Sequence, residues 1–464
     1  MDAASTGGEA VDPGERPPRA RLLPWIVLTV AIGTVVTDAM TRRDLSAGED
    51  DPEWSADPGL LSYKLMRLAT VLVLAVSASA VVRGALRRGF PRAGLPVWLG
   101  YMGFVATCFV LPGLTGRVPG FDVRLLYPPL AFTAVYFARP VSTAGLATLS
   151  RVVLGASVYG SLVAALVLPS QALAANYVGF FPWLDFRLYG VGGGATSLGM
   201  VSSTFLALEM VSPSRSRWRF LHLAAGTTAL FLTQAKTSWL FVLAVVAYFV
   251  LRRLSRRLAS LTRPAGVSVR VLAFAAVGSG LLALAGLTGY QLSRLDVDSL
   301  RGGENLATLT GRTYIWATSL NTWLDDPLFG YGLGLWEGEY RAKYAPLYPH
   351  AHNQFIQTLA SAGLVGLLGL LAYLWAAWRS AIRAAPTTPV PAVLLAAILS
   401  QCLTNVPLRG QYLLEPLVVV HLLMFAALVN GDKLVRAAAE GLEGGIGSAV
   451  DPEALTRNSA PAAP

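Results

Sequence analysis

Long apolar runs, separated by short polar segments, dominate the chain. A window of about 19 apolar residues is the mark of a membrane-crossing segment, and the sequence contains twelve such runs, at 22–40, 66–83, 96–113, 124–138, 150–169, 191–211, 218–235, 237–252, 269–289, 354–378, 389–408 and 411–430. Backbone amides in lipid must form hydrogen bonds within their own segment, so these runs are expected to be helices. The fourth run is the weakest, because it is short and contains Pro128 and Pro129. The pattern predicts an all-α polytopic membrane protein with about 12 transmembrane helices.

The composition agrees with this pattern and excludes other classes. Hydrophobic residues make up 54% of the 464 positions and charged residues 14%, against about 25% charged residues in soluble domains. The mean hydropathy is +0.53. A chain so poor in charge cannot cover itself with polar surface in water, and it fits neither a disordered chain, a coiled coil nor collagen. The 2 cysteines, Cys108 and Cys402, both lie in apolar runs and allow neither a disulfide framework nor a zinc site.

Basic residues indicate the sidedness of the membrane helices. If the N-terminus is cytoplasmic, the basic clusters of the loops all fall on the cytoplasmic side, as the positive-inside rule requires. Five loops carry these clusters: Arg83, Arg87, Arg88 and Arg92 in the first; Arg139 and Arg151 in the second; Arg215, Arg217 and Arg219 in the third; the six arginines between 252 and 270 in the fourth; and Arg379 and Arg383 in the fifth. The acidic loop at 42–62 then lies outside. The net charge of +10 is therefore mostly an orientation signal, and nucleic-acid binding is not expected.

The topology divides the chain into five parts. We expect a cytoplasmic N-terminal tail at 1–21, transmembrane helices 1–9 at 22–289, a large extracytoplasmic loop at 290–353, helices 10–12 at 354–430, and a disordered cytoplasmic tail at 431–464. So long a loop within a compact bundle is usually functional. Apolar and aromatic residues recur in it at steps of three and four, which predicts an amphipathic helix; they include Leu306, Leu309, Trp316, Leu320 and Trp323.

Four segments with candidate chemistry converge on the extracytoplasmic face. The first is 185–194, which contains Arg187, and the second is the tight turn at 234–238, which contains Lys236. The third is the loop segment 311–334, which begins with Gly-Arg312 and holds a Pro-Leu-Phe-Gly-Tyr-Gly turn. The fourth is 350–357, with the sequence His-Ala-His352-Asn-Gln-Phe-Ile-Gln, which leads into a glycine-rich apolar run.

The last two segments resemble the O-antigen ligase/polymerase superfamily of bacterial membrane glycosyltransferases. That superfamily carries a Gly-Arg…Trp segment, a Pro-hydrophobic-x-Gly-x-Gly turn and a His-Asn-x-hydrophobic segment that enters a glycine-rich helix, and this sequence has all three in the same order. Two further matches are weaker. Residues 187–190 are similar to an Arg-x-x-Gly stretch of the superfamily, and Lys236 stands where the superfamily often has arginine. The resemblance covers about residues 180–410 and is most specific at 311–366.

The resemblance implies a polyprenyl-dependent transferase of the GT-C class in the bacterial inner (cytoplasmic) membrane, with an extracytoplasmic active site. The donor would be a glycan on undecaprenyl diphosphate, the acceptor a glycan or glycolipid, and no cofactor or metal would be needed. The diphosphate leaving group needs cations near the membrane surface, and arginine binds phosphate oxygens with a planar fork. Arg187, Lys236 and Arg312 would supply them, and Arg312 would also stabilise the charge that develops in the reaction. His352 would accept the proton of the attacking hydroxyl, supported by His350 and Asn353.

Several of these residues also allow a structural interpretation. A basic residue at a membrane edge is often an anchor whose head group reaches water, and this interpretation of Lys236 is as good as the functional one. Arg187 has Asp185 as a nearby partner. Glu415 is a third supporting candidate, which could orient the base or pair with Arg409.

Other histidines and acidic residues also allow structural interpretations. His222 and His421 lie within apolar runs and are expected to be structural, and Glu209 is expected to pair with the nearby Arg215. His350 and His352 could bind zinc as a His-x-His pair, but no third ligand with suitable spacing is evident. The triplet Asp-Val-Asp at 296–298 resembles the metal-binding triplet of many sugar transferases, although such a triplet in a polar loop is usually solvated.

The sequence therefore predicts a membrane glycosyltransferase that inverts the anomeric configuration. A ligase, which uses a foreign acceptor, and a polymerase, which uses another repeat unit, are not distinguished. A secondary transporter or lipid-linked sugar flippase is the alternative from another class, because 12 helices with both termini inside are common among transporters. Transporters place polar groups near the bilayer midplane, whereas most of the charge of interest here lies at the extracytoplasmic rim.

Overall fold

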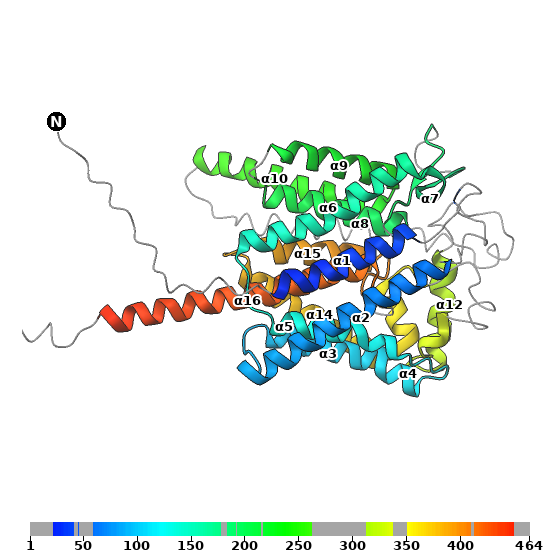
Figure 1. Ribbon diagram of the computed structural model, residues 1–464, viewed down its shortest axis with the longest axis horizontal. Coiled ribbons are helices and arrows are strands. Elements are labelled where there is room, and N and C mark those ends of the chain that lie inside the picture. Colours follow the sequence, from blue (N-terminus) through cyan, green and yellow to red (C-terminus); the bar gives the residue numbers. More distant parts are fainter. Residues whose placement is uncertain are drawn as a thin grey trace, which may run out of the picture.

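The computed structural model is a bundle of mostly parallel and antiparallel helices (Figure 1). It describes residues 22–40, 45, 59–177, 183–191, 193–214, 217–261, 312–336, 350–409 and 413–449. The helices of the first half are α1 (Leu22–Met40), α2 (Gly59–Arg88), α3 (Leu95–Val105), the π-helical turn η2 (Ala106–Val110), α4 (Leu111–Thr115), the 3-10 turn η3 (Val123–Leu126), α5 (Tyr127–Phe137), α6 (Thr143–Val167) and α7 (Pro169–Ala172).

A short antiparallel pair of strands, β1 (Leu173–Ala174) and β2 (Arg187–Leu188), follows, with Leu173 opposite Leu188. The remaining helical elements are α8 (Ala195–Val211), α9 (Trp218–Thr233), α10 (Lys236–Leu261), α12 (Arg312–Asp325), the 3-10 turn η6 (Leu333–Trp336), α14 (Gln354–Ala384), α15 (Val390–Cys402) and α16 (Pro416–Ala449). The described chain is thus almost entirely helical, in agreement with an all-α membrane protein.

Five of the described helices are long and apolar enough to cross a membrane: Tyr63–Leu86, Leu95–Thr115, Thr143–Val167, Gln354–Ala384 and Pro416–Glu440. Five shorter apolar helices accompany them: Leu23–Thr37, Val123–Phe137, Ala195–Val211, Lys236–Leu251 and Val390–Cys402. The ninth predicted span, at 269–289, lies outside the described residues, as does 290–311 of the predicted loop. The count of about 12 spans and the five-part division of the chain stay predictions.

The helix α16 forms the centre of the bundle. Of its most apolar window, 83% is buried inside the protein, against 17% for the window of α2, which faces outward. Val420, Leu423 and Met424 of α16 are fully buried. The helix runs on past residue 430, where the sequence predicts the tail to begin, and ends at Ala449.

An aromatic cluster joins α3, α5, α14 and α16 in this core. The ring of Tyr101 stacks on that of Phe132 at 4.3 Å, and its edge faces Tyr373 and His421. The hydroxyl of Tyr373 and Nε2 of His421 lie 2.8 Å apart in a hydrogen bond. His421 is 4% exposed, and its packing agrees with the structural role expected from the sequence.

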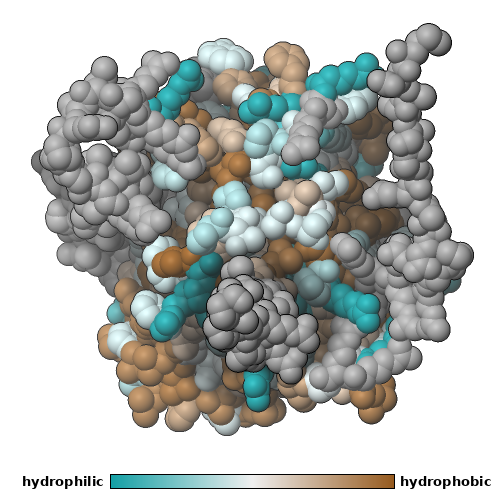
Figure 2. All heavy atoms as spheres, turned by 90° about the vertical axis from the view of Figure 1, so that its left-hand side faces the viewer, coloured by the Kyte–Doolittle hydropathy of each residue, from teal (hydrophilic) through white to brown (hydrophobic). Residues whose placement is uncertain are grey.

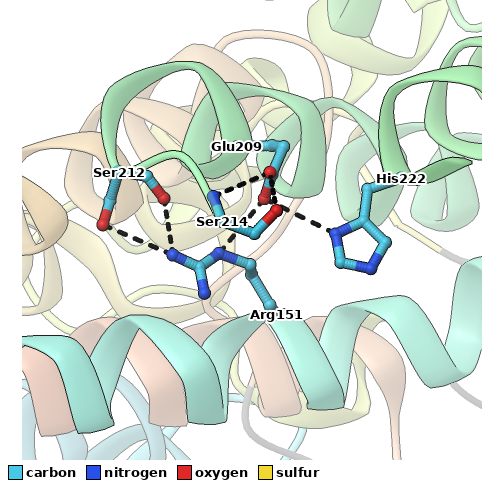
Figure 3. Close-up of polar contacts among 5 residues, drawn as sticks. All are labelled: Arg151, Glu209, Ser212, Ser214 and His222. Carbon is cyan, nitrogen blue, oxygen red and sulfur yellow. Dashed lines mark hydrogen bonds and ion pairs between the residues drawn. The ribbon is translucent and has the colours of Figure 1, made fainter. Parts of the chain in front are cut away.

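A buried carboxylate ties together α6, α8 and α9 (Figure 3). Glu209 of α8 is fully buried; its Oε2 lies 3.1 Å from Nε of Arg151 and 3.6 Å from Nδ1 of His222. The backbone N–H of Ser214 donates to Oε1 at 2.9 Å. The sequence suggested Arg215 as the partner of Glu209, but Arg215 lies outside the described residues and Arg151 is the partner found. Removing one member of such a buried pair leaves an uncompensated charge, which costs about 3–5 kcal/mol.

The two ends of the bundle differ in character. The short elements α4, α7 and α12 lie at the right-hand end in Figure 1, and α12 runs across the ends of the longer helices there. Figure 2 shows the opposite end, where hydrophilic side chains are spread over the face and hydrophobic ones predominate along its lower edge in this view. The helices α2, α10, α14 and α16 extend toward that end and carry exposed arginines in their C-terminal parts, namely Arg83, Arg253, Arg379, Arg383 and Arg436. This is the distribution that the positive-inside rule predicts; which end faces the cytoplasm stays a prediction.

Candidate functional site

The histidine segment lies at the α12 end, immediately before α14. Asn353 is the N-cap of α14: its Oδ1 accepts from the backbone N–H groups of Phe355 at 2.9 Å and Ile356 at 3.1 Å. Such a cap satisfies amide groups that the first turn of a helix leaves unpaired. The side-chain nitrogen of Asn353, Nδ2, donates to the carbonyl oxygen of Leu403 at 3.2 Å, just beyond the end of α15. Asn353 therefore fixes the chain direction just where His352 precedes the helix.

Backbone conformation and hydrogen bonds hold His352 in place. Its φ is +51°, in the left-handed region that non-glycine residues rarely adopt. Its N–H donates to Nδ1 of His350 at 3.1 Å, and the two imidazole rings lie 4.2 Å apart. Ala351 between them is held from both sides, because its carbonyl accepts from Nε1 of Trp316 at 2.7 Å and its N–H donates to Oε1 of Gln357 at 2.8 Å.

Two arginines and burial determine the charge of His352. Burial lowers the pKa of His352 first, and the positive charges of Arg312 and Arg409 lower it further, to about 3 from an ordinary value of 6.5. A buried imidazole loses solvation when it is protonated, and like charges nearby oppose the same proton. The imidazole is therefore neutral at neutral pH. Arg312 is the first residue of α12, which Trp316 connects to the histidine segment.

The glycine-rich turn after α12 is docked onto a break in α14. Gly363 in α14 has φ +62°, and the backbone there leaves the helical conformation. The N–H groups after the break bond to the turn instead, from Leu364 to the oxygen of Pro327 at 2.9 Å and from Val365 to Leu328 at 3.1 Å. In return the turn donates from Tyr331 to the carbonyl of Ala360 at 2.8 Å and from Gly332 to Ser361 at 3.0 Å. The Pro-x-x-Gly-x-Gly turn and the glycine-rich helix that the sequence analysis identified thus bind each other through backbone hydrogen bonds.

We expect Gly363→Ala to destabilise the protein and to reduce its activity. A Cβ at Gly363 would clash with the carbonyl oxygen of Leu328, and the backbone conformation, φ +62° and ψ −162°, is unfavourable for alanine by about 1–3 kcal/mol before any clash. The midpoint of thermal unfolding of the purified protein should therefore fall by several degrees. Gly103→Ala is the matched control, because a Cβ at that helical position meets nothing within 4 Å. Equal midpoints for the two variants would show that the turn does not depend on the break.

Arg187 and Lys236 form a second basic group at the turn between α9 and α10. Nε of Arg187, in β2, donates to the carbonyl oxygen of Thr233 at 2.8 Å, and its guanidinium lies 4.8 Å from the ring centre of Tyr177. Gln234 has φ +49° and donates from Nε2 to the oxygen of Phe186 at 3.0 Å, which joins the turn to the strand. Lys236 begins α10, and its side chain is exposed.

The end of α15 connects these basic residues with the histidine segment. Oγ1 of Thr404 donates to Oγ1 of Thr237 at 2.9 Å, and Nε2 of Gln401 donates to Oγ of the buried Ser238 at 3.1 Å. The neighbouring Leu403 is the residue whose carbonyl accepts from Asn353. The structure thus gathers His350, His352, Asn353 and Arg312 directly, and connects Arg187 and Lys236 to them through α15.

Glu415 pairs with Arg409, which is one of the two roles that the sequence allowed for it. The distance from Nη2 of Arg409 to Oε1 of Glu415 is 3.4 Å, and both side chains are about three-quarters buried. Arg409 also acts on the pKa of His352, a role that sequence reasoning missed. The signal that could have found it was a basic residue in the short polar segment between two apolar runs, on the same side as the histidines.

The described residues offer no cluster of three or more His, Cys, Asp or Glu side chains that could hold a metal ion. Asp296 and Asp298, the metal-binding alternative, lie outside the described residues.

Fold and site together define a class: a helical membrane protein with an imidazole and several cations gathered at one end of the bundle. Within this class, residues 221–371 match the family described as O-antigen ligase, over about a third of the chain. The match runs from α9 to the middle of α14 and includes Lys236, Arg312 and the histidine segment, whereas Arg187, Arg409 and Glu415 lie outside it. No curated protein matches the chain. The family match confirms the resemblance to the O-antigen ligase/polymerase superfamily and supports a function of that type, in a membrane glycosyltransferase-like enzyme.

Proposed function

We propose that the protein transfers a glycan from undecaprenyl diphosphate to an acceptor hydroxyl at the extracytoplasmic face of the bacterial inner membrane, in the synthesis of cell-surface polysaccharide. The observation that carries the proposal is the placement of His352, a neutral imidazole held in a fixed turn beside Arg312 at one end of the bundle. The match to the O-antigen ligase family includes both residues. A base next to a cation fits a reaction that takes a proton from one substrate and releases an anion from the other.

The proposed step is an in-line displacement. The acceptor hydroxyl attacks the anomeric carbon of the donor sugar while the bond from that carbon to the diphosphate oxygen breaks, so that the configuration inverts. His352 takes the hydroxyl proton, and the leaving diphosphate keeps the bonding electron pair. Arg312 binds the diphosphate from the side of His352, and Arg187 and Lys236 bind it from the α9–α10 turn, since developing charge is stabilised best by groups that are already in position.

Donor binding should also strengthen the base. Without substrate, the charge of Arg312 helps to lower the pKa of His352 to about 3, and so acidic an imidazole is a weak proton acceptor. A bound diphosphate brings negative charge next to Arg312 and offsets this part of the shift, so the pKa of His352 rises, whereas burial, the larger cause, continues to lower it. His352 would then be a stronger base in the donor complex than in the free protein.

This coupling predicts a particular pH dependence. The acid limb of kcat/KM for the donor reports the free enzyme, so it should lie well below pH 6.5, because the pKa of His352 is lowered to about 3. The acid limb of kcat reports the donor complex and should lie at higher pH. Arg312→Gln removes one cause of the shift and should raise the pKa of His352, which is measurable through the pH dependence of its modification by diethyl pyrocarbonate. Identical limbs near pH 6.5 for kcat and kcat/KM would contradict the coupling.

A single-turnover assay tests the function directly. The full chain, purified into lipid nanodiscs, is mixed with an undecaprenyl-diphosphate glycan and with either a foreign glycolipid or a second copy of the repeat unit as acceptor. We expect one glycosidic bond per turnover, with inverted anomeric configuration in the NMR spectrum of the product. The preferred acceptor distinguishes a ligase from a polymerase. Movement of the lipid-linked glycan across a vesicle bilayer without bond formation would instead identify a flippase.

The reaction is expected to need no metal. Transfer should continue at an unchanged rate after EDTA treatment, because Arg312, Arg187 and Lys236 would supply the positive charge that the diphosphate requires. Loss of activity that a divalent ion restores would contradict this expectation and would direct attention to Asp296 and Asp298.

A further inference from the structure

A small cavity adjoins the histidine segment on the side of α3. It lies between the π-helical turn η2, the 3-10 turn η6, the first turns of α14 and the segment before α16, and its lining includes Phe104, Phe109, Trp336, Gln357 and Arg409. Gln357 is also the residue that holds Ala351 next to His352. The cavity volume is about 30 Å³, which is room for about two water-sized groups. It can therefore receive the edge of a ligand that carries one or two hydroxyl groups.

Two N–H groups in the lining have no partner among the described residues. Nε1 of Trp336 and Nε of Arg409 are buried without a hydrogen bond, and the Trp336 side chain is 8% exposed. Buried polar groups are almost always hydrogen-bonded, and an unsatisfied donor is unfavourable. Both residues line the same cavity. An oxygen-rich ligand in this cavity would give both donors an acceptor.

The charge of the cavity favours a neutral ligand over a phosphate. Arg409 is the cation in the lining, and its charge is compensated by Glu415 at 3.4 Å. The other polar side chains of the lining are uncharged; they are Trp336, Gln354, Gln357, Thr358 and Ser361. Phe109, which is partly exposed, adds aromatic surface beside these polar groups, against which the C–H edge of a sugar ring can pack. Hydroxyl oxygens beside an apolar face are the chemistry of a pyranose.

We propose that this cavity is the acceptor subsite, in which Trp336 and Arg409 bind hydroxyl groups of the acceptor sugar ring and present a neighbouring hydroxyl to His352. The inference rests on the proposed function and deepens it, because it assigns the acceptor to residues other than those proposed to bind the diphosphate. Trp336 and Arg409 would then determine which acceptor sugars fit. The π-helical turn contributes to the same wall through Cys108 and Phe109, and such turns are frequent at functional sites.

Binding measurements with two probes test this assignment. The full chain in nanodiscs is titrated with inorganic pyrophosphate and with a panel of labelled oligosaccharides of one to four hexose or N-acetylhexosamine units. Trp336→Phe keeps the ring and removes the N–H, so oligosaccharide affinity should fall by about three- to tenfold, the effect of one neutral hydrogen bond. Pyrophosphate affinity should not change. Trp375→Phe is the matched control, because Trp375 lies in the outward-facing part of α14 and is 62% exposed.

Arg312→Ala completes the design, since it should weaken pyrophosphate binding and leave oligosaccharide binding unchanged. The subsite is overturned if no oligosaccharide of the panel binds the unaltered protein, or if Trp336→Phe affects pyrophosphate and not the sugars. Its failure differs from failure of the proposed function. If glycan transfer occurs but Trp336→Phe leaves the KM for the acceptor unaltered, only the acceptor subsite is contradicted. If oligosaccharides bind through Trp336 but no glycan is transferred from the lipid donor, only the transferase function is contradicted.

Discussion

Replacing His352 by alanine should lower the rate of glycan transfer by about 10²–10⁴-fold, the contribution of a positioned general base. The imidazole is neutral in the free protein and lies in a turn fixed by Trp316, Gln357 and Asn353. Donor binding should be nearly unchanged, because the base acts on the acceptor. Single-turnover rates at saturating donor, together with donor affinity, measure both effects in the same preparation.

His350→Ala provides the comparison for this variant. The Nδ1 of His350 accepts from the backbone of His352, so its loss disturbs the turn without removing the base. We expect a smaller reduction in rate than for His352→Ala, with equal amounts of protein in the membrane. Near-normal transfer by His352→Ala would remove His352 from the mechanism.

The second large effect is expected for Arg312. Arg312→Ala should lower the transfer rate by about 10²–10³-fold, because a preorganised donor at the developing negative charge is lost. Arg312→Lys should recover only part of the activity, since the ammonium group keeps the charge but not the bidentate fork. Donor KM should rise in both variants, and kcat should fall more in the alanine variant.

Arg117 offers a matched control for the loss of a positive charge. It lies at the same end of the bundle, 3.7 Å from Asp325 at the end of α12, and its side chain is 57% exposed. Exposed ion pairs of this kind contribute little, so Arg117→Ala should leave the rate within about twofold of the unaltered protein. Equal losses for Arg117→Ala and Arg312→Ala would indicate a general dependence on surface charge and not a diphosphate site.

The helices were predictable because apolar runs in lipid have few alternatives to helical structure. Ten apolar helices in the described residues fall on predicted runs, including the proline-containing fourth, where Tyr127–Phe137 follows a 3-10 turn. The ends of helices were less predictable. α16 passes residue 430 without a break, because hydropathy marks where the apolar run ends and not where helical hydrogen bonding ends.

The site was predictable where chemistry is encoded locally. His352 and Asn353 are adjacent, and the asparagine before an apolar run is a recognisable helix start. The break at Gly363 and the pairing of its amides with Pro327 and Leu328 depend on contacts distant in the sequence. The same holds for the effect of Arg409 on His352 and for the unpaired N–H of Trp336, since both arise only when η6, α14 and the segment before α16 meet.

The break at Gly363 also divides α14 into a long helical segment, residues 364–384, and a short one, residues 354–362. Residues 364–384 span about 31 Å as a helix, close to the roughly 30 Å thickness of a hydrocarbon core. Residues 354–362, on the other side of the break, form a further helical segment about 13 Å long. If residues 364–384 cross the hydrocarbon, His352 lies outside it, at the headgroups or in the water next to them. A polyprenyl carrier could then keep its tail among the acyl chains while its charged group reaches the imidazole, and the sugars would remain in water throughout the exchange.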